Sequence, residues 1–168
     1  MNNVSAFLKF VGAMSAVGPT NLLQAAVGLD FSQSLQFTAG TGALQCDQIY
    51  TQQGTLTYGQ STTLTLSALT DCFGAALVMA RLKGYAFINN SSVSNTSFAV
   101  GGAGNTVNLF TPQTASESIP MGGFVSKGFA DATGIPITVA SSDKLVITNN
   151  GSAGSTTVYN LYLLGASA

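Results

Sequence analysis

From Phe31 to the end of the chain, hydrophobic and polar residues alternate in short runs, which is the period of a β-strand with one buried face. The clearest runs are SLQFT, TTLTLSAL, AALVMARLKGYAFIN, SFAVGG, TVNLF, ESIP, GGFVSKGF, PITVA, KLVITN and TTVYNLYLL. We expect the third run to be interrupted at Gly84. Turn signals such as Thr70-Asp71, Gly122-Gly123 and Asn150-Gly151 separate the runs. Many short strands without intervening helices predict an all-β sandwich or a closed barrel.

The last two runs predict a pair of core strands. In KLVITN, Leu145 and Ile147 share one face of the strand, and in the final run Tyr159, Leu161 and Leu163 share one face. A Gly/Ser-rich turn joins the two runs. We therefore expect Leu145, Ile147, Leu161 and Leu163 to lie in the core.

Residues 1–29 follow a different pattern. Their apolar residues recur at spacings of three and four, which favours a short helix capped by Ser5 and ended at Gly18-Pro19, with an extended arm as the alternative. We divide the chain into this N-terminal arm or short helix (1–29) and a β domain (30–168). The apolar residues concerned are Phe7, Leu8, Phe10, Val11 and Met14.

This apolar set has two possible uses. It can cover the protein's own β domain, or it can dock on a neighbouring subunit. Gly18-Pro19 and Gly28 supply hinges that suit the second use. We therefore take the five apolar residues as candidate partner contacts.

The chain is 168 residues long, which fits one domain with an appended arm. Charged residues make up only 7% of it, whereas about 25% is usual for soluble proteins. Free protein surfaces normally rely on mixed charges for solubility. The composition therefore predicts a surface that is largely occupied by other copies of the chain or by another protein.

Nucleic-acid binding does not fit this composition. The net charge is −1, and the five basic residues are scattered, so a row of phosphate contacts is not available. Only Arg81 and Lys83 are close together, and on a strand both would lie on one solvated or contact-forming face.

Cys46 and Cys72 are too few for a disulfide framework, and we expect two buried free thiols.

The N-terminus and the hydropathy pattern indicate no membrane association. Lys9 interrupts the first apolar stretch and no basic residue precedes it, so we expect this segment to be retained rather than cleaved as a signal peptide. No run of 18 or more apolar residues suggests a transmembrane helix.

Catalytic and metal-binding patterns are also missing from the sequence. The chain has no His, which removes the common catalytic triads and most zinc or iron sites. The VGGAGN segment lies among strands rather than before a helix, and DATG at 131–134 reads as a turn. The six acids lie in apparent turns or edges, where local hydrogen bonding explains them: Asp30, Asp47, Asp71, Glu117, Asp131 and Asp143. We predict no catalytic residue, no metal site, no cofactor and no enzymatic activity.

Three segments carry a resemblance to a known group of proteins: LTLSALTDCFGAALVMARLKGYAFINNSS, SIPMGGFVSKG and KLVITNNGSAGSTTVYNLYLLGASA. Over residues 56–168 the chain resembles small virion structural proteins of tailed bacteriophages. The resemblance implies a jelly-roll-like domain, displayed in many copies as a capsid cement (decoration) protein or as a tail or fibre component. It carries over no functional residue.

These observations together predict a non-enzymatic phage structural protein. We expect a homo-oligomer, a trimer by preference, that is assembled in the host cytoplasm and sits on the capsid surface, where it bridges subunits of the major capsid protein. The alternative is a tail, baseplate or receptor-binding fibre component. A glycan depolymerase and a secreted adhesin or pilin-like subunit are more distant alternatives.

Overall fold

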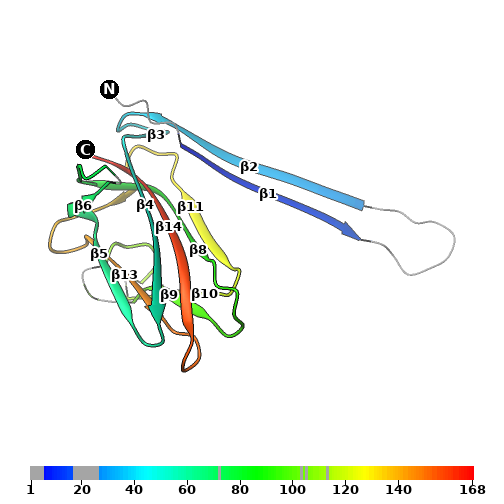
Figure 1. The fold of residues 1–168 in the computed structure, drawn as a ribbon. Helices are drawn as coiled ribbons and strands as arrows, with labels where there is room; N and C mark the ends of the chain where they lie inside the picture. The colour runs from blue at the N-terminus through cyan, green and yellow to red at the C-terminus, as the bar shows by residue number, and fades with distance from the viewer. Residues whose placement is uncertain (1–5, 17–26, 72, 103, 105, 113) are drawn as a thin grey trace.

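The computed structural model describes residues 6–16, 27–71, 73–102, 104, 106–112 and 114–168, and it shows a β-sandwich with a long hairpin arm (Figure 1). The eight main strands of the sandwich are β4 (Gln48–Thr57), β5 (Ser61–Thr65), β8 (Arg81–Asn89), β9 (Ser97–Gly101), β10 (Ser116–Pro120), β11 (Phe124–Gly128), β13 (Lys144–Asn149) and β14 (Thr156–Ala166). Short strands β3 (Gln45–Cys46), β6 (Leu69–Thr70), β7 (Ala76–Leu77) and β12 (Ile135–Pro136) and one 3-10 turn, η1 (Leu66–Ala68), complete the domain. The all-β prediction is confirmed.

The strand order is that of a jelly roll. One sheet has the order β4-β14-β8-β11 and the other β5-β13-β9-β10. If the eight main strands are numbered in chain order, these sheets read 1-8-3-6 and 2-7-4-5, so consecutive strands usually cross between the sheets, as in two Greek keys. The chain enters the sandwich at the edge strand β4 and ends in the interior strand β14, which pairs with both β4 and β8.

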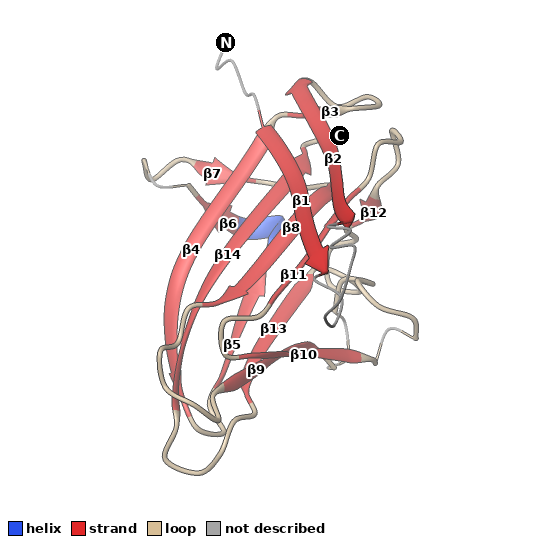
Figure 2. Ribbon diagram, turned by 90° about the vertical axis from the view of Figure 1, so that its right-hand side faces the viewer, coloured by secondary structure: helices blue, strands red, loops and turns tan. Residues whose placement is uncertain are grey.

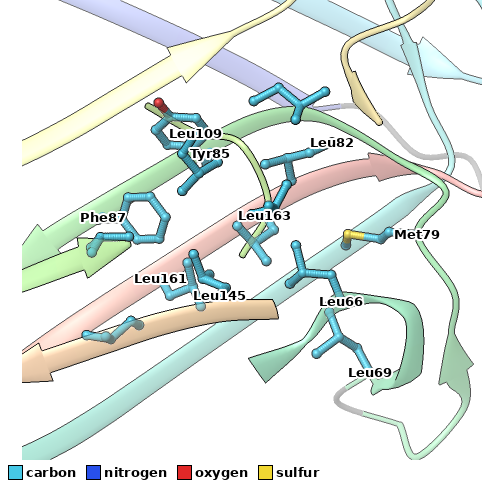
Figure 3. Packing of buried hydrophobic residues seen from close by; sticks show 14 of the residues in the cluster. Leu66, Leu69, Met79, Leu82, Tyr85, Phe87, Leu109, Leu145, Leu161 and Leu163 are labelled. Carbon is cyan, nitrogen blue, oxygen red and sulfur yellow. The ribbon is translucent and has the colours of Figure 1, made fainter. Parts of the chain in front are cut away.

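The core between the two sheets contains the residues that the alternation of hydrophobic and polar positions in β13 and β14 predicts to be buried. Leu145, Ile147, Leu161 and Leu163 are each at most 1% exposed, and Tyr159 is 2% exposed. Figure 3 shows Leu145, Leu161 and Leu163 packed together with Phe87 and Met79, which come from an earlier part of the chain. The predicted faces of β13 and β14 are therefore confirmed.

Three expectations about individual strands are wrong. The third run is interrupted at residues 78–80, between β7 and β8, and β8 continues through Gly84. Residues 106–110 make only one isolated bridge, from Thr106 to Lys144, although Val107 and Leu109 are buried. The PITVA run contributes only the two-residue strand β12, followed by an isolated bridge at Thr138.

Strand β4 is absent from the sequence-based prediction because its sequence, QIYTQQGTLT, has little hydrophobic contrast. Leu56 is its one buried residue. Gly54 is required by a close approach, since a Cβ there would overlap the ring of Tyr159, its partner in β14. Ten register pairs with β14, rather than its own pattern, hold β4 in the sheet.

The N-terminal segment is an extended arm, not a helix, over the residues described. Strand β1 (Ala6–Ala16) pairs antiparallel with β2 (Val27–Ala39) over its whole length. Phe, Val, Gly and Ser are modest or poor helix formers, and cross-strand pairing outweighs the weak helical spacing. Ser5 and Gly18-Pro19, the predicted ends of the helix, lie outside the described residues. The hairpin leaves the end of the sandwich and projects away from it (Figures 1 and 2).

Leu161→Ala should lower the free energy of unfolding by about 2–5 kcal/mol, because it removes a fully buried side chain between the sheets. The neighbouring Asn160→Ala, on the opposite face of β14, should change it by less than about 0.5 kcal/mol. Thermal or denaturant unfolding of both purified variants measures the difference. Equal stabilities would show that the assignment of the two faces of β14 is incorrect.

Candidate functional site

Asp71, Asp131 and Asp143 accept hydrogen bonds that hold turns and loops in place, and Asp47 accepts two from Ser167, just after β14. Asp71 Oδ1 accepts hydrogen bonds from the backbone N–H groups of Phe73 and Ala75 at 2.9 and 2.7 Å. Asp131 Oδ1 accepts one from Gly134 N at 2.6 Å, so DATG is a turn as predicted, and this bond is the main reason that the pKa of Asp131 is lowered. Asp143 Oδ2 accepts a hydrogen bond from Ser67 Oγ at 2.7 Å, which likewise lowers the pKa of Asp143.

The described residues contain no cluster of three or more Cys, Asp or Glu side chains that could hold a metal ion. Cys46 is buried and free, as predicted, and burial raises the pKa of its thiol. Cys72 lies outside the described residues. Cys46 and Asp131 both interact electrostatically with Lys83, which places these groups together near the base of the arm.

Lys83 holds the base of the arm, contrary to the expectation that it lies on a solvated face with Arg81. Its side chain is fully buried, and its ammonium group donates to the backbone carbonyls of Gly42 and Asp131. The cause is a bulge: Leu164 pairs with Gly84 but Gly165 pairs with Leu82, so Lys83 is the extra residue in β8. Arg81 remains partly exposed and donates to the carbonyl of Ala132.

The segment after β2 is therefore tied to the sandwich by polar contacts. Besides Lys83, the backbone N–H of Leu44 donates to the carbonyl of Ala130 at 2.9 Å. Desolvation is the largest influence on Lys83 and lowers its pKa below the ordinary lysine value. These contacts fix the point from which the arm departs.

The register of the arm separates its residues into two faces, because alternate positions of a strand lie on the same side. Six pairs make what we call the apolar arm face: Ala6–Phe37, Leu8–Leu35, Phe10–Gln33, Gly12–Phe31, Met14–Leu29 and Ala16–Val27. Five pairs make the polar arm face: Phe7–Gln36, Lys9–Ser34, Val11–Ser32, Ala13–Asp30 and Ser15–Gly28. Both charged residues of the two strands fall on the polar arm face.

The strand register divides the candidate contact set between the two faces, and the set itself stays a prediction. Leu8, Phe10 and Met14 belong to the apolar arm face, whereas Phe7 and Val11 belong to the other. Helical spacing had grouped them because steps of three and four mix odd and even positions. Sequence reasoning missed Leu29 and Phe31, although period-two alternation in VGLDFSQSLQF carries their signal.

The root of the apolar arm face is packed on the domain. Phe37 is fully buried and forms a small second core with Cys46, against which Leu35 and Leu164 pack. Ser34 and Gln36, on the polar arm face, are exposed. Leu164 belongs to β14 and lies on the side of its sheet that faces away from the main core.

That side of the β11-β8-β14-β4 sheet, which we call the outer sheet face, carries no charged residue. It consists of alternate positions within 49–55, 84–88, 124–128 and 158–164. Ile49, Tyr162 and Phe124 on it are 38%, 42% and 56% exposed. Solvated sheet faces are normally polar, so an uncharged face with exposed aromatics is typical of an interaction surface.

A third feature lies on the other side of the sandwich. The turn between β6 and β7 presents Phe73, which is 90% exposed, and Asp71 fixes the conformation of this turn through its two hydrogen bonds. Strand β6 lies on the side of the domain away from the arm (Figure 1). An exposed phenylalanine on a well-defined turn is a suitable anchor for a partner.

Comparisons with known proteins add no relative. Protein-family models, curated proteins and solved structures yield no match to this chain. None of the described residues forms an apolar helix of membrane-spanning length.

The stability supplied by Lys83 should depend on pH. Its folded-state pKa is lowered, so between that value and the ordinary 10.5 the unfolded chain binds more protons, and the unfolding free energy rises with pH. Lys83→Met removes this contribution. The difference in unfolding free energy between wild type and Lys83→Met should therefore shift in favour of wild type as pH approaches 10.5.

Denaturant unfolding at a series of pH values measures this difference, and comparison with the variant cancels the titration of the tyrosines. Lys127→Met, at an exposed lysine, is the matched control and should follow the wild-type curve. A difference between wild type and Lys83→Met that is constant with pH would contradict the role of desolvation.

Proposed function

We propose that this protein is a non-enzymatic structural protein of a phage virion, and specifically a capsid cement protein that bridges subunits of the major capsid protein. The observation that carries the proposal is the arm: a hairpin whose root packs on the domain through Leu35 and Phe37 and whose two strands project away from the sandwich. A two-stranded hairpin is at best marginally stable alone in water. The arm therefore needs a neighbour to cover it, as an assembled particle provides.

Two separate contact features support bridging. The arm leaves one side of the sandwich, and the Phe73 turn lies on the other side. In the proposed role, the arm binds a neighbouring subunit of the assembly and the Phe73 turn anchors the domain on the capsid. Many modest contacts of this kind add through avidity when copies are displayed on a lattice. The scarcity of charge suits such surfaces, because charged residues are depleted in the cores of interfaces.

The jelly-roll order is compatible with this role but does not establish it, because one fold serves many functions. The local roles of Asp71, Asp131 and Asp143 also agree with a structural protein. A glycan depolymerase would need two carboxylates free to act on a sugar, and incubation of the purified protein with host polysaccharide tests that alternative.

Copy number separates the proposed location from the alternative. A capsid cement protein should be present in numbers similar to those of the major capsid protein. A tail, baseplate or fibre component should be present in far fewer copies. Quantitative gel analysis of purified virions, with the major capsid protein as internal standard, measures this ratio, and a low ratio would favour the tail alternative.

Deletion of residues 1–29 should leave the β domain folded but weaken its attachment to cement-free capsids by at least about tenfold, or 1.4 kcal/mol. The truncated chain keeps Leu35 and Phe37, so the second core is preserved. Thermal unfolding and capsid co-sedimentation measure the two effects. A truncated protein that binds as well as the full chain would show that the arm has no part in attachment, and one that fails to fold would show that the arm serves its own domain.

Phe73→Ser supplies an independent test of the second anchor. Because Phe73 is almost fully exposed, the substitution should leave the melting temperature unchanged while reducing capsid binding. Val139→Ser, at another exposed apolar residue, is the control and should bind normally. Equal binding by wild type and Phe73→Ser would remove this turn from the proposed interface.

A further inference from the structure

We propose that the outer sheet face binds a neutral glycan, with the ring of Tyr162 as the platform for a sugar and the amide and hydroxyl groups beside it as hydrogen-bonding partners. This inference goes beyond the proposed function, in which only the arm and the Phe73 turn attach the protein to its particle. It can be tested on the purified chain in the absence of any capsid.

The site consists of two directly opposed pairs of side chains on adjacent strands. Thr51 of β4 lies opposite Tyr162 of β14, and Gln53 lies opposite Asn160. Opposed residues have Cβ atoms about 5 Å apart, and the two pairs are about 7 Å apart along the strands. Strands β4 and β14 run side by side along the sandwich (Figure 1). We call these four residues the Tyr162 patch.

The Tyr162 patch lines a shallow depression with a volume of about 330 Å³. Ligand sites in proteins usually have volumes of about 300–1,000 Å³, so the depression suits a small ligand or a short stretch of a longer one. Tyr162 is 42% exposed, and Thr51 and Gln53 are exposed as well. A ligand in the depression can therefore reach these side chains directly.

The polar groups of the Tyr162 patch are available to a ligand. Among the described residues, no hydrogen bond engages the four side chains. The buried amide of Asn149, in contrast, donates to the carbonyl of Leu56 at 2.8 Å and accepts from the backbone N–H of Gly151 at 2.9 Å. Each amide and hydroxyl of the patch can both donate and accept a hydrogen bond, and a sugar hydroxyl needs partners of both kinds.

The absence of charge selects the class of ligand. At the positions that the structure describes, the outer sheet face has no charged side chain to pair with a phosphate, a carboxylate or an ammonium group. An apolar ligand, or the apolar core of a protein interface, would leave the amides of Gln53 and Asn160 buried without partners. A neutral glycan offers hydroxyl groups to these amides and an apolar C–H face to the ring of Tyr162.

The Tyr162 patch lies on paired strands and not on a loop. Strand β14 is hydrogen-bonded to β4 on one side and to β8 on the other, so the patch needs little ordering when a ligand binds. A single shallow site of this kind binds weakly. Display of many copies on one particle would add the weak contacts through avidity.

The first test is an array of neutral and acidic oligosaccharides. The full chain is coupled to fluorescent beads so that many copies act together. We expect the beads to bind neutral glycans, and an increase in salt from about 0.05 M to about 0.5 M should leave this binding unchanged, because salt screens only charges. An array on which no neutral glycan is bound, or binding that is lost at high salt, would overturn the inference.

Point variants locate the site. Tyr162→Ala should weaken binding of the best neutral glycan by at least about tenfold, and Gln53→Ala by about three- to tenfold, the loss of one hydrogen bond. Tyr58→Ala, at a tyrosine that is 51% exposed in the turn between β4 and β5, and Gln60→Ala in the same turn are the matched controls. Both controls should bind as the wild type does.

Isothermal titration calorimetry with the free glycan measures these affinities, and thermal unfolding checks that every variant is folded. All the substitutions are at exposed positions, so the melting temperatures should change little. Equal affinities for wild type, Tyr162→Ala and Gln53→Ala would place the glycan elsewhere on the protein and contradict the assignment.

Binding to cement-free capsids separates this inference from the proposed function. Tyr162→Ala should bind capsids as well as the wild type does, because the arm and the Phe73 turn are intact. Loss of capsid binding by this variant would show that the outer sheet face contacts protein, and the glycan assignment would be wrong. A chain that binds neutral glycans through the Tyr162 patch but does not bind capsids would support this inference and contradict the cement role.

Discussion

The structure depends on the pairing of the last strand of the chain, β14, with two strands from distant parts of the sequence. It pairs with β4 on one side and with β8 on the other. On its inner side it supplies Tyr159, Leu161 and Leu163 to the core, and on its outer side it supplies Leu164 to the root of the arm. Loss of this strand would open the sheet and remove one of the contacts that hold the root of the arm.

The arm is held where that sheet departs from regular geometry. The bulge in β8 turns Lys83 out of the alternating pattern and brings its ammonium group to the carbonyls of Gly42 and Asp131. Burying a lysine is costly unless hydrogen bonds compensate, and here they join two loops at the arm's base. Apolar packing by Phe37 and polar contacts by Lys83 thus act at the same place.

The low content of charged residues can be related to two surfaces of the structure. The outer sheet face and the apolar arm face together form a continuous set of positions without charge. Burial of apolar surface is favourable in water, so these are the surfaces on which the proposed assembly and binding would depend. The charged side chains of Asp71, Asp131 and Lys83 each form hydrogen bonds that hold a turn or a loop in place.

The sequence by itself determined the all-β class and the core faces of β13 and β14, because period-two alternation reports directly which side of a strand is buried. Local turn chemistry likewise predicted the Asp131 turn, since an aspartate and a glycine three residues apart suffice for it. These features depend on neighbours in the chain. The sequence did not determine β4, because the position of this strand depends on pairing with a strand about a hundred residues later.

Only the tertiary structure decided the extended form of the arm, the burial of Lys83 and the existence of an uncharged outer sheet face. The arm's spacing fits either a helix or a strand, and pairing with β2 resolves the choice. A single extra residue in β8 moves Lys83 off the face that alternation assigns to it. The outer sheet face is composed of four strands, and their relative register is set by long-range hydrogen bonds that a local pattern does not contain.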